Sequence, residues 1–163
     1  MYSELAGGYS KEDFVEFVKK NQVMVLSVED KEWSVQATTV FYAIESQDAL
    51  LIKSHTTSHH GSVIKNGAKV AMAIYDTKST YSNKTGVQLR GVCERIYDKD
   101  EMLNAIKIYS DTFEGAAARF APLDELVSED AKSTLFRIRL VSGKMLSPEG
   151  YSPDFQAVWD ALE

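Results

Sequence analysis

Short stretches that are apolar, or that alternate between apolar and polar residues, recur along most of the chain and are separated by polar turns. Six of them predict β-strands, at residues 23–28, 33–44, 49–53, 68–75, 87–97 and 135–141. The segment 33–44 carries two rows of semi-polar side chains, which suits a barrel wall with the core on one side and a ligand or partner subunit on the other. Because short turns favour antiparallel pairing, the pattern predicts a small, mainly β barrel.

Apolar residues spaced three or four positions apart predict helices around these strands. The spacing of Phe14, Phe17 and Val18 predicts one helix after a capping-box-like start at residues 10–13. Asp98 is placed to cap a second long helix. Shorter helical pieces are predicted at residues 62–66 and 113–120, and a terminal helix has Phe155, Val158, Trp159 and Leu162 on its apolar face.

Three connecting or irregular features are also predicted. Residues 76–86 form a loop rich in Ser, Thr, Lys and Asn. This loop is longer than a simple hairpin connection, so we expect it to be exposed or folded over a site. Gly91, inside a predicted strand, indicates a bulge or a close backbone approach. The acidic segment 124–130 is predicted to be a connector.

Composition and charge favour one ordinary globular domain over residues 1–163. The 24 acidic and 18 basic residues give a net charge of -6, which argues against the broad positive field of a nucleic-acid-binding protein. No apolar stretch approaches the roughly 20 residues of a membrane helix, and the first ten residues do not resemble a signal peptide. Because Cys93 is the single cysteine, no intramolecular disulfide can form, and we expect a cytoplasmic protein. From the charge and the short apolar stretches we expect it to bind neither nucleic acid nor membranes.

All three histidines lie within six residues, in the polar loop that follows the third predicted strand. His55, His59 and His60 share this loop with the hydroxyl-bearing residues 56–58. Hydroxyls, imidazoles and the backbone amides of the helix predicted to start at residue 62 suit a phosphate-sized anion. A solvated loop without function is an equally open alternative. We predict no metal site, because adjacent residues rarely point at one ion and no other histidine exists.

Motifs of several common enzyme classes are missing from the sequence. It contains no G-x-S-x-G elbow, no Walker phosphate loop and no G-x-G-x-x-G after a strand, which argues against hydrolase, nucleoside triphosphatase and Rossmann functions. Cys93 is expected to be a small buried hydrophobe. The strand residues Arg90, Arg95, Arg137 and Arg139 are expected to be solvated or paired on the outer surface, although one of them could instead face a ligand phosphate.

Several pieces of sequence follow one another in a known order: a strand at 49–54, then Ser58-His-His60, a short helix at 63–67, and strands at 69–74 and 86–91. In this order they resemble the pyridoxamine 5'-phosphate oxidase-like family of flavin-binding split barrels, over about residues 14–146. The resemblance implies a mainly β (β+α) fold, namely a six-stranded antiparallel split barrel with peripheral helices. It also implies flavin mononucleotide (FMN) bound at the interface of a homodimer.

Transferred residue by residue, the resemblance implies ten FMN contacts but no acid or base. They are Thr38, Thr39, Val40 and Phe41 beside the isoalloxazine ring, Lys53 and Ser54 near the ribityl chain and phosphate, Ser58, His59 and His60 on the phosphate, and Gln88 facing the ring.

Two departures from the family pattern bear on function. His60 stands where the family usually has lysine, and the unperturbed imidazole pKa is about 6.5. We therefore expect FMN binding to tighten as the pH falls from about 8 to 6. The chain also lacks the C-terminal Arg-Leu-x-Pro-like segment of the authentic oxidase, so oxidation of pyridoxamine phosphate is not expected. Three functions stay open: a flavin-dependent oxidoreductase with an unidentified small-molecule substrate, a non-catalytic flavin-binding or sensing module, and a heme-handling protein.

Overall fold

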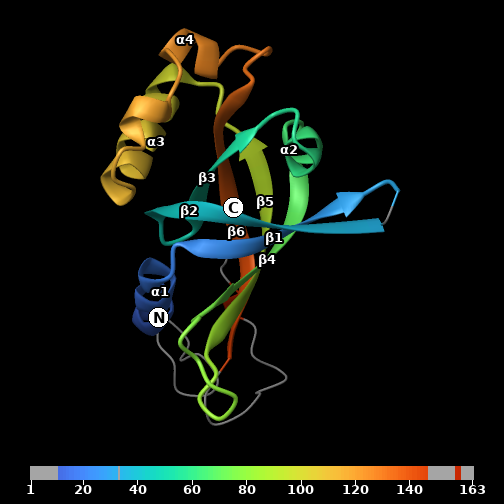
Figure 1. Ribbon diagram of the computed structural model, residues 1–163, viewed down its shortest axis with the longest axis vertical. Coiled ribbons are helices and arrows are strands. Elements are labelled where there is room, and N and C mark those ends of the chain that lie inside the picture. The colour runs from blue at the N-terminus through green and yellow to red at the C-terminus, as the bar shows by residue number, and fades with distance from the viewer. Residues whose placement is uncertain (1–10, 33, 147–156, 159–163) are drawn as a thin grey trace.

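Six antiparallel strands close into a barrel in the computed structural model, which describes residues 11–32, 34–146 and 157–158 (Figure 1). They are β1 (Val23–Asp30), β2 (Ser34–Ser46), β3 (Ala49–His55), β4 (Ala68–Tyr75), β5 (Gly86–Arg95) and β6 (Ser133–Leu146). They lie in the order β3-β2-β1-β4-β5-β6, and β3 also pairs with β6, which closes the barrel. The predicted mainly β class, the six strands and the antiparallel pairing are confirmed.

Every second residue of the strands points into the barrel, which is the period expected of a strand with one buried face. On β1, for example, Met24, Leu26 and Val28 are buried. Side chains from all six strands join them in one interior core. Burial of each large apolar side chain contributes about 1.5 to 3 kcal/mol, so this core is the main source of stability.

Helix α1 (Lys11–Lys20) packs on this core through Phe14 and Val18. The buried Tyr42 of β2 ties the helix down, because its hydroxyl donates to the Val18 carbonyl at 2.7 Å and also contacts the Asn21 carbonyl. Burial raises the pKa of Tyr42 well above its ordinary value. The phenol therefore stays protonated and serves as a hydrogen-bond donor.

A second core lies outside the barrel, beneath α3 (Lys99–Thr112) and α4 (Leu123–Leu126). Figure 1 shows these two helices together on one side of the barrel. Leu51 of β3 and Met102 of α3 belong to this outer core, whereas Leu50 and Ile52 point into the barrel. Strand β3 is therefore buried on both faces, which explains why its sequence is apolar throughout rather than alternating.

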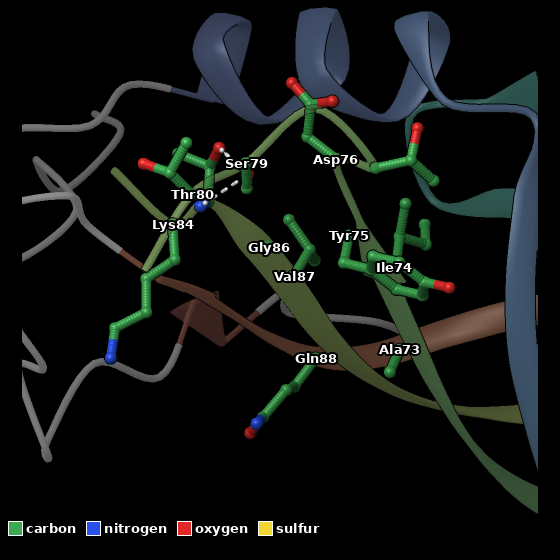
Figure 2. A pocket seen from close by; sticks show the side chains of 12 residues that line it. Ala73, Ile74, Tyr75, Asp76, Ser79, Thr80, Lys84, Gly86, Val87 and Gln88 are labelled. Atoms are coloured by element: carbon green, nitrogen blue, oxygen red, sulfur yellow. Dashed lines mark hydrogen bonds between the residues drawn. The ribbon is translucent and has the colours of Figure 1, made fainter. Parts of the chain in front are cut away.

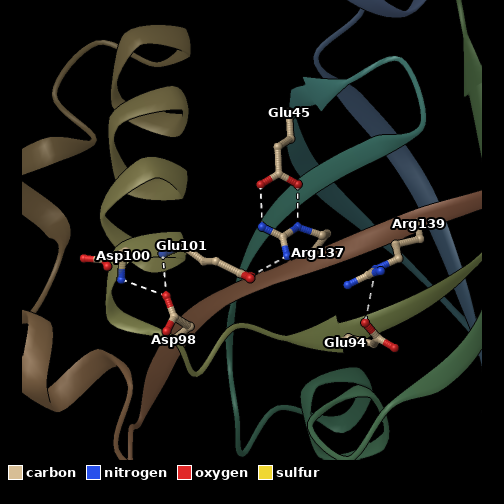
Figure 3. Close-up of polar contacts among 7 residues, drawn as sticks. All are labelled: Glu45, Glu94, Asp98, Asp100, Glu101, Arg137 and Arg139. Atoms are coloured by element: carbon tan, nitrogen blue, oxygen red, sulfur yellow. Dashed lines mark hydrogen bonds and ion pairs between the residues drawn. The ribbon is translucent and has the colours of Figure 1, made fainter.

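An ion-pair network fastens α3 to the sheet (Figure 3). Arg137 of β6 donates to both carboxylate oxygens of Glu45 on β2, at 2.5 and 2.7 Å, and to Glu101 of α3 at 2.6 Å. Hydrogen bonding to Glu45 is the largest of the effects that raise the pKa of Arg137, so this side chain is a permanent cation. Arg139, two positions along the same strand, makes a looser pair with Glu94 at 3.3 Å.

Arg95 corrects the expectation that all strand arginines lie on the outer surface. Its side chain is buried and donates to the carbonyls of Leu126, Ser128 and Glu129. These carbonyls belong to the segment 124–130, which is partly helical because α4 occupies its start. The buried guanidinium is therefore held by backbone carbonyls of this segment, and it fastens the segment to the end of β5.

Other element boundaries also differ from the predictions. Residues 113–120 form no regular α-helix and contain one 3₁₀ turn, Ala117–Arg119. Strand β6 continues beyond residue 141, and its open edge at Ser142–Gly143 pairs with β7 (Ala157–Val158), where a terminal helix was predicted. The predicted cap at Ser10, Trp33, and the helical residues Phe155, Trp159 and Leu162 lie outside the described residues. Within the described ranges, no helix is long and apolar enough to cross a membrane.

Candidate functional site

The polar loop after β3 leads directly into α2 (His59–Ile64), whose N-cap is Ser58. The Ser58 hydroxyl accepts a hydrogen bond from the Gly61 amide at 3.1 Å and donates to the His55 carbonyl at 2.8 Å. The predicted helix start at residue 62 is therefore wrong, because Ser58 caps the chain earlier. As a consequence, His59 and His60 lie on the first turn of the helix.

Three of the predicted phosphate contacts come together at this turn. The buried Ser54 hydroxyl lies 2.9 Å from Nε2 of His60 and 3.3 Å from the Ser58 hydroxyl, and the latter is 3.5 Å from the same imidazole nitrogen. Burial lowers the pKa of His60, and the neighbouring charge of His59 lowers it further. The His60 imidazole is therefore mostly neutral at pH 7 and acts through hydrogen bonding more than through charge.

Gly61 makes the tight packing of this turn possible. A Cβ atom at this position would lie 1.9 Å from the His55 carbonyl oxygen and 2.7 Å from the Ser58 hydroxyl. No side chain fits there without displacement of the loop backbone. Glycine at position 61 thus allows Ser54, Ser58 and His60 to converge, and we call these three residues the hydroxyl–imidazole cluster.

His59 points to a different partner. Its Nε2 atom pairs with Oδ2 of Asp30, a carboxylate that is only 2% exposed at the end of β1. The other oxygen of Asp30 accepts the Glu32 amide at 2.8 Å in the following turn. Sequence analysis missed Asp30 by placing it in a polar turn. The two-residue period could have predicted that Asp30 is buried, because Asp30 continues the series of inward-pointing residues Met24, Leu26 and Val28.

Lys53 is adjacent to Ser54 in sequence but lies on the opposite face of β3, as alternation requires. Its ammonium group is 5.5 Å from the centre of the Phe120 ring, outside the barrel. Phe113 and Phe41 also belong to this aromatic region, with ring centres 5.7 Å apart. The structure therefore does not bring Lys53 into the hydroxyl–imidazole cluster.

The predicted ring contacts divide between the two faces of β2. Val40 is buried and points into the barrel, and Thr38 shares its side of the strand, whereas Thr39 and Phe41 are exposed on the outer face. Thr39 pairs in register with Val25, Val25 with Ala73, and Ala73 with Gln88. Thr39 and Gln88 are both predicted ring contacts and are far apart in sequence. The register places them in one row that crosses four strands.

Small side chains keep this outer face flat. The next register row contains Ala37, Ser27 and Ala71, followed by the exposed Arg90 on β5. We call the outer surface of β2, β1, β4 and β5 around these two rows the open sheet face. The small side chains of Ala37, Ser27, Ala71 and Ala73 leave room for a planar group on this part of the face.

A pocket of about 370 Å³ lies where β4 ends and β5 begins (Figure 2). Its walls are the two strand ends and the polar loop between them, so the loop predicted at residues 76–86 lies at a pocket. Ala73 and Gln88 line this pocket and also belong to the four-strand row. We call it the hairpin pocket. In the part of the chain that the structure describes, no three His, Cys, Asp or Glu side chains are arranged to hold a metal ion.

Comparison with known sequences gives one match. The sequence profile described as pyridoxamine 5'-phosphate oxidase matches residues 10–145. No curated protein matches the chain.

Solved structures with the same fold are numerous but distant in sequence. A heme-binding protein from Mycobacterium smegmatis has a TM-score of 0.71 and 18% identity over 92% of this chain, which spans 58% of that protein. A conserved hypothetical protein from Mycobacterium tuberculosis, Rv2991, has a TM-score of 0.68 and 14% identity, covering 90% of this chain and 88% of that one. An FAD- and heme-binding protein from M. smegmatis has a TM-score of 0.63 and 15% identity, covering 89% of this chain and 74% of that one. At these identities the similarity shows the fold alone.

Proposed function

The chain belongs to the pyridoxamine 5'-phosphate oxidase family, whose profile covers residues 10–145, and from this premise we propose that it binds FMN between two copies of itself. We further propose that it is a flavin-dependent oxidoreductase acting on a small molecule. The observation that carries the proposal is the hydroxyl–imidazole cluster of Ser54, Ser58 and His60. Each of these groups can donate a hydrogen bond to a phosphate oxygen.

The chemistry of the cluster fits a terminal phosphate. A phosphate offers acceptor oxygens, and bonds from neutral donors to such a charged acceptor are stronger than neutral pairs. In the protein alone, the Ser58 hydroxyl donates to the His55 carbonyl at 2.8 Å, and the Ser54 hydroxyl lies 2.9 Å from Nε2 of His60. Each hydroxyl would rotate away from its present partner to donate to a ligand. His59 faces Asp30, which leaves the cluster with little fixed positive charge. We therefore expect a moderate rather than very tight affinity.

The open sheet face fits the flavin ring. Figure 1 shows α2 at one end of the barrel and the β4–β5 hairpin at the other, so the row through Thr39 and Gln88 lies between them. A ribityl phosphate chain can bridge the cluster and this row. Thr39 and the Gln88 amide can hydrogen-bond to the polar edge of the ring, and the small side chain of Ala73 leaves room for its plane. FMN supplies hydride-transfer chemistry when bound, while these residues bind and orient it.

Exposed apolar residues support the homodimer. Val35, Phe41 and Tyr75 lie on the strands of the open sheet face and are 63%, 58% and 59% exposed. Large exposed apolar side chains on one sheet face are typical of an interaction surface. A second copy on this face would cover both these side chains and the ring.

Heme is the second candidate, because His55 is exposed and two similar structures come from heme-binding proteins. His59 and His60 are engaged through Nε2, with Asp30 and Ser54, which leaves the exposed His55 as the imidazole for iron. FMN is favoured because Ser54, Ser58 and His60 together offer the hydrogen bonds that a phosphate accepts.

Purified protein incubated with FMN tests the proposal. We expect quenching of flavin fluorescence at one FMN per chain and the mass of a dimer by light scattering. Anaerobic bleaching of the bound flavin by a reduced nicotinamide would support an enzyme over a non-catalytic module. A Soret band with hemin and no uptake of FMN would replace the proposal with heme binding. No uptake of either, together with the mass of one chain, would refute both.

A further inference from the structure

We propose that two copies of the chain pair in antiparallel fashion through the free edge of β2, with Thr38 on the two-fold axis. One sheet then runs from the first barrel into the second. The pairing forms part of the interface of the homodimer, and it therefore rests on the function proposed above.

More than half of β2 has a neighbouring strand on one side only. Strand β1 pairs with residues 34–41 of β2, whereas β3 pairs only with residues 42–46. Among the described residues, no strand pairs with the other side of residues 34–41. Figure 1 shows this part of β2 running out beyond the barrel together with β1. We call this unpaired side of residues 34–41 the β2 edge.

Backbone alternation determines which groups the β2 edge offers. The Tyr42 amide donates to the Gln22 carbonyl at 3.1 Å, so the backbone of Tyr42 faces the β1 side. In an antiparallel pair, successive residues turn their N–H and C=O groups to opposite sides of the strand. The odd-numbered residues therefore direct both groups to the β2 edge, and these residues are Val35, Ala37, Thr39 and Phe41.

The β2 edge lacks the features that normally prevent sheet edges from pairing. Residues 34–41 contain no charged residue and no proline, and their register with β1 has no bulge. Two other exposed strand ends are covered by the chain itself: His59 of α2 pairs with Asp30 at the end of β1, and β7 pairs with the end of β6. An uncovered and uncharged edge of this length is a template for another strand.

A second copy of β2 fits this edge in one register. When Thr38 lies opposite the partner subunit's Thr38, Val35 lies opposite the partner subunit's Phe41. Ala37 then lies opposite the partner subunit's Thr39. All four edge-facing residues of each copy bond in pairs, whereas a shift of two residues places one of them opposite a residue outside the edge.

The side chains of the edge complement themselves in this register. Val35 and Phe41, which are 63% and 58% exposed, become cross-strand neighbours on the outer face, and apolar pairs of this kind stabilise a sheet. On the other face of β2, Oε1 of Gln36 is buried and accepts no hydrogen bond from the described residues. Gln36 lies diagonal to the partner subunit's Thr38, whose hydroxyl can donate to it.

The pairing also extends the open sheet face toward the second copy. Thr39 ends the four-strand row that begins at Gln88, and in this register the row continues at the partner subunit's Ala37. A flavin ring on the row therefore lies next to the second copy. One strand pair is a small contact compared with the roughly 1,000 Å² of a stable interface. We therefore assign to it the register of the interface, while the exposed apolar side chains supply further contact.

Thr38→Cys tests the register by covalent trapping. Opposite residues of a pair without mutual hydrogen bonds have Cα atoms about 4.5 Å apart, which allows a disulfide. The flavin-free full chain is treated with diamide, which takes up the hydrogens of both thiols, and the linked dimer is measured on a non-reducing gel. The native Cys93 does not interfere, because burial raises its pKa to about 12.

Gln36→Cys is the matched control, because it lies on the same strand and the same face. In the proposed register its two copies are four residues apart along the strand, or about 13 Å, which is too far for a disulfide. We expect Thr38→Cys to link at least tenfold faster than Gln36→Cys.

Amide hydrogen exchange provides a second test without any substitution. The four odd-numbered amides of the β2 edge should exchange at least tenfold more slowly at millimolar than at low micromolar concentrations of the wild-type protein. The amides of residues 36, 38 and 40 bond to β1 by the same alternation, so their exchange should not depend on concentration.

Three results would each overturn the pairing: no linkage of Thr38→Cys, equal linkage of the two cysteine variants, or edge amides that are protected in a solution of single chains. FMN uptake by a dimer that shows one of these results would leave the proposed function standing, with the two copies joined elsewhere. Selective linkage of Thr38→Cys in a protein that takes up no FMN would refute the proposed function and leave the edge pairing intact.

Discussion

The Nε2 atom of His60 lies 2.9 Å from the hydroxyl oxygen of Ser54, and this contact joins the first turn of α2 to the end of β3. Ser54 is buried, so its hydroxyl has few alternatives to the groups around it. Both side chains come from the loop in which sequence analysis predicted an anion site. The contact fixes the geometry in which a phosphate would meet them.

Ser54→Ala should weaken FMN binding about tenfold, because it removes one hydrogen-bond donor to a charged oxygen. The loss is measured as the dissociation constant from flavin fluorescence quenching. Thr57→Ala is the matched control, since Thr57 is exposed in the same loop. An equal effect of the two substitutions would indicate that Ser54 does not contact the phosphate.

His60 should make stability depend on pH in a defined direction. Burial and the charge of His59 lower its pKa in the folded protein below the unfolded value of about 6.5. Below that pH the unfolded chain binds more protons at this site than the folded chain does, so the free energy of unfolding falls as the pH falls. Urea denaturation between pH 8 and 5 should show this decline, and His60→Gln should reduce it. Thr57→Ala, which changes an exposed residue of the same loop and removes no titratable group, should leave the slope unchanged.

The lowered pKa of His60 also moves the predicted rise in FMN affinity to lower pH. A bound phosphate favours the protonated imidazole, so affinity should still rise as the pH falls. The rise should lie mostly below about pH 6.5, where the second ionisation of the phosphate, near pH 6, begins to oppose it. Fluorescence titrations at several pH values measure it, and a constant affinity from pH 8 to 6 would leave no role for imidazole charge.

Local pattern was enough to predict the strands and one of their irregularities. The six strands followed from the two-residue period and the short polar turns. Gly91 was predicted to mark a bulge, and the β5–β6 register does shift between Arg90 and Gly91. A Cβ atom at Gly91 would lie 2.6 Å from the Arg139 carbonyl oxygen. The two-residue period and the glycine itself are visible in the sequence, whereas the Arg139 contact that requires the glycine is seen only in the structure.

Features that depend on distant contacts could not be predicted. The pair of Asp30 and His59 joins residues that are far apart in sequence, and only the closed barrel brings them together. The start of α2 was misplaced because Ser58 and Ser62 are both good caps by local criteria. The row through Thr39 and Gln88 required the register of four strands. Ser54, Ser58 and His60 converge as a group, whereas Lys53 and His59 face other partners.

Gly61→Ala should disrupt the hydroxyl–imidazole cluster, because the new Cβ atom would lie 1.9 Å from the His55 carbonyl oxygen. We expect loss of at least tenfold in FMN affinity and a destabilisation of about 2 kcal/mol or more from the forced backbone shift. Gly115→Ala is a useful contrast. Gly115 has φ of +75° with nothing within 4 Å of its added Cβ, so the cost should be about 1 kcal/mol without any change in FMN affinity. Fluorescence quenching and urea denaturation measure the two quantities.

The two arginines of β6 should differ sharply in their contribution to stability. The side chains of Arg137 and Glu45 are 16% and 11% exposed, and their two hydrogen bonds have good geometry (Figure 3). Arg137→Met leaves the Glu45 carboxylate without its partner in a poorly solvated place and should lower the free energy of unfolding by about 2 to 3 kcal/mol. Arg139 and Glu94 are 45% and 49% exposed, so Arg139→Met should cost less than about 0.5 kcal/mol.

Urea denaturation at neutral pH compares the variants. Adding Glu45→Gln to Arg137→Met should recover part of the loss, because the unpaired Glu45 carboxylate is then removed. Equal costs for the two arginine variants would show that burial of the Arg137 pair does not determine its effect.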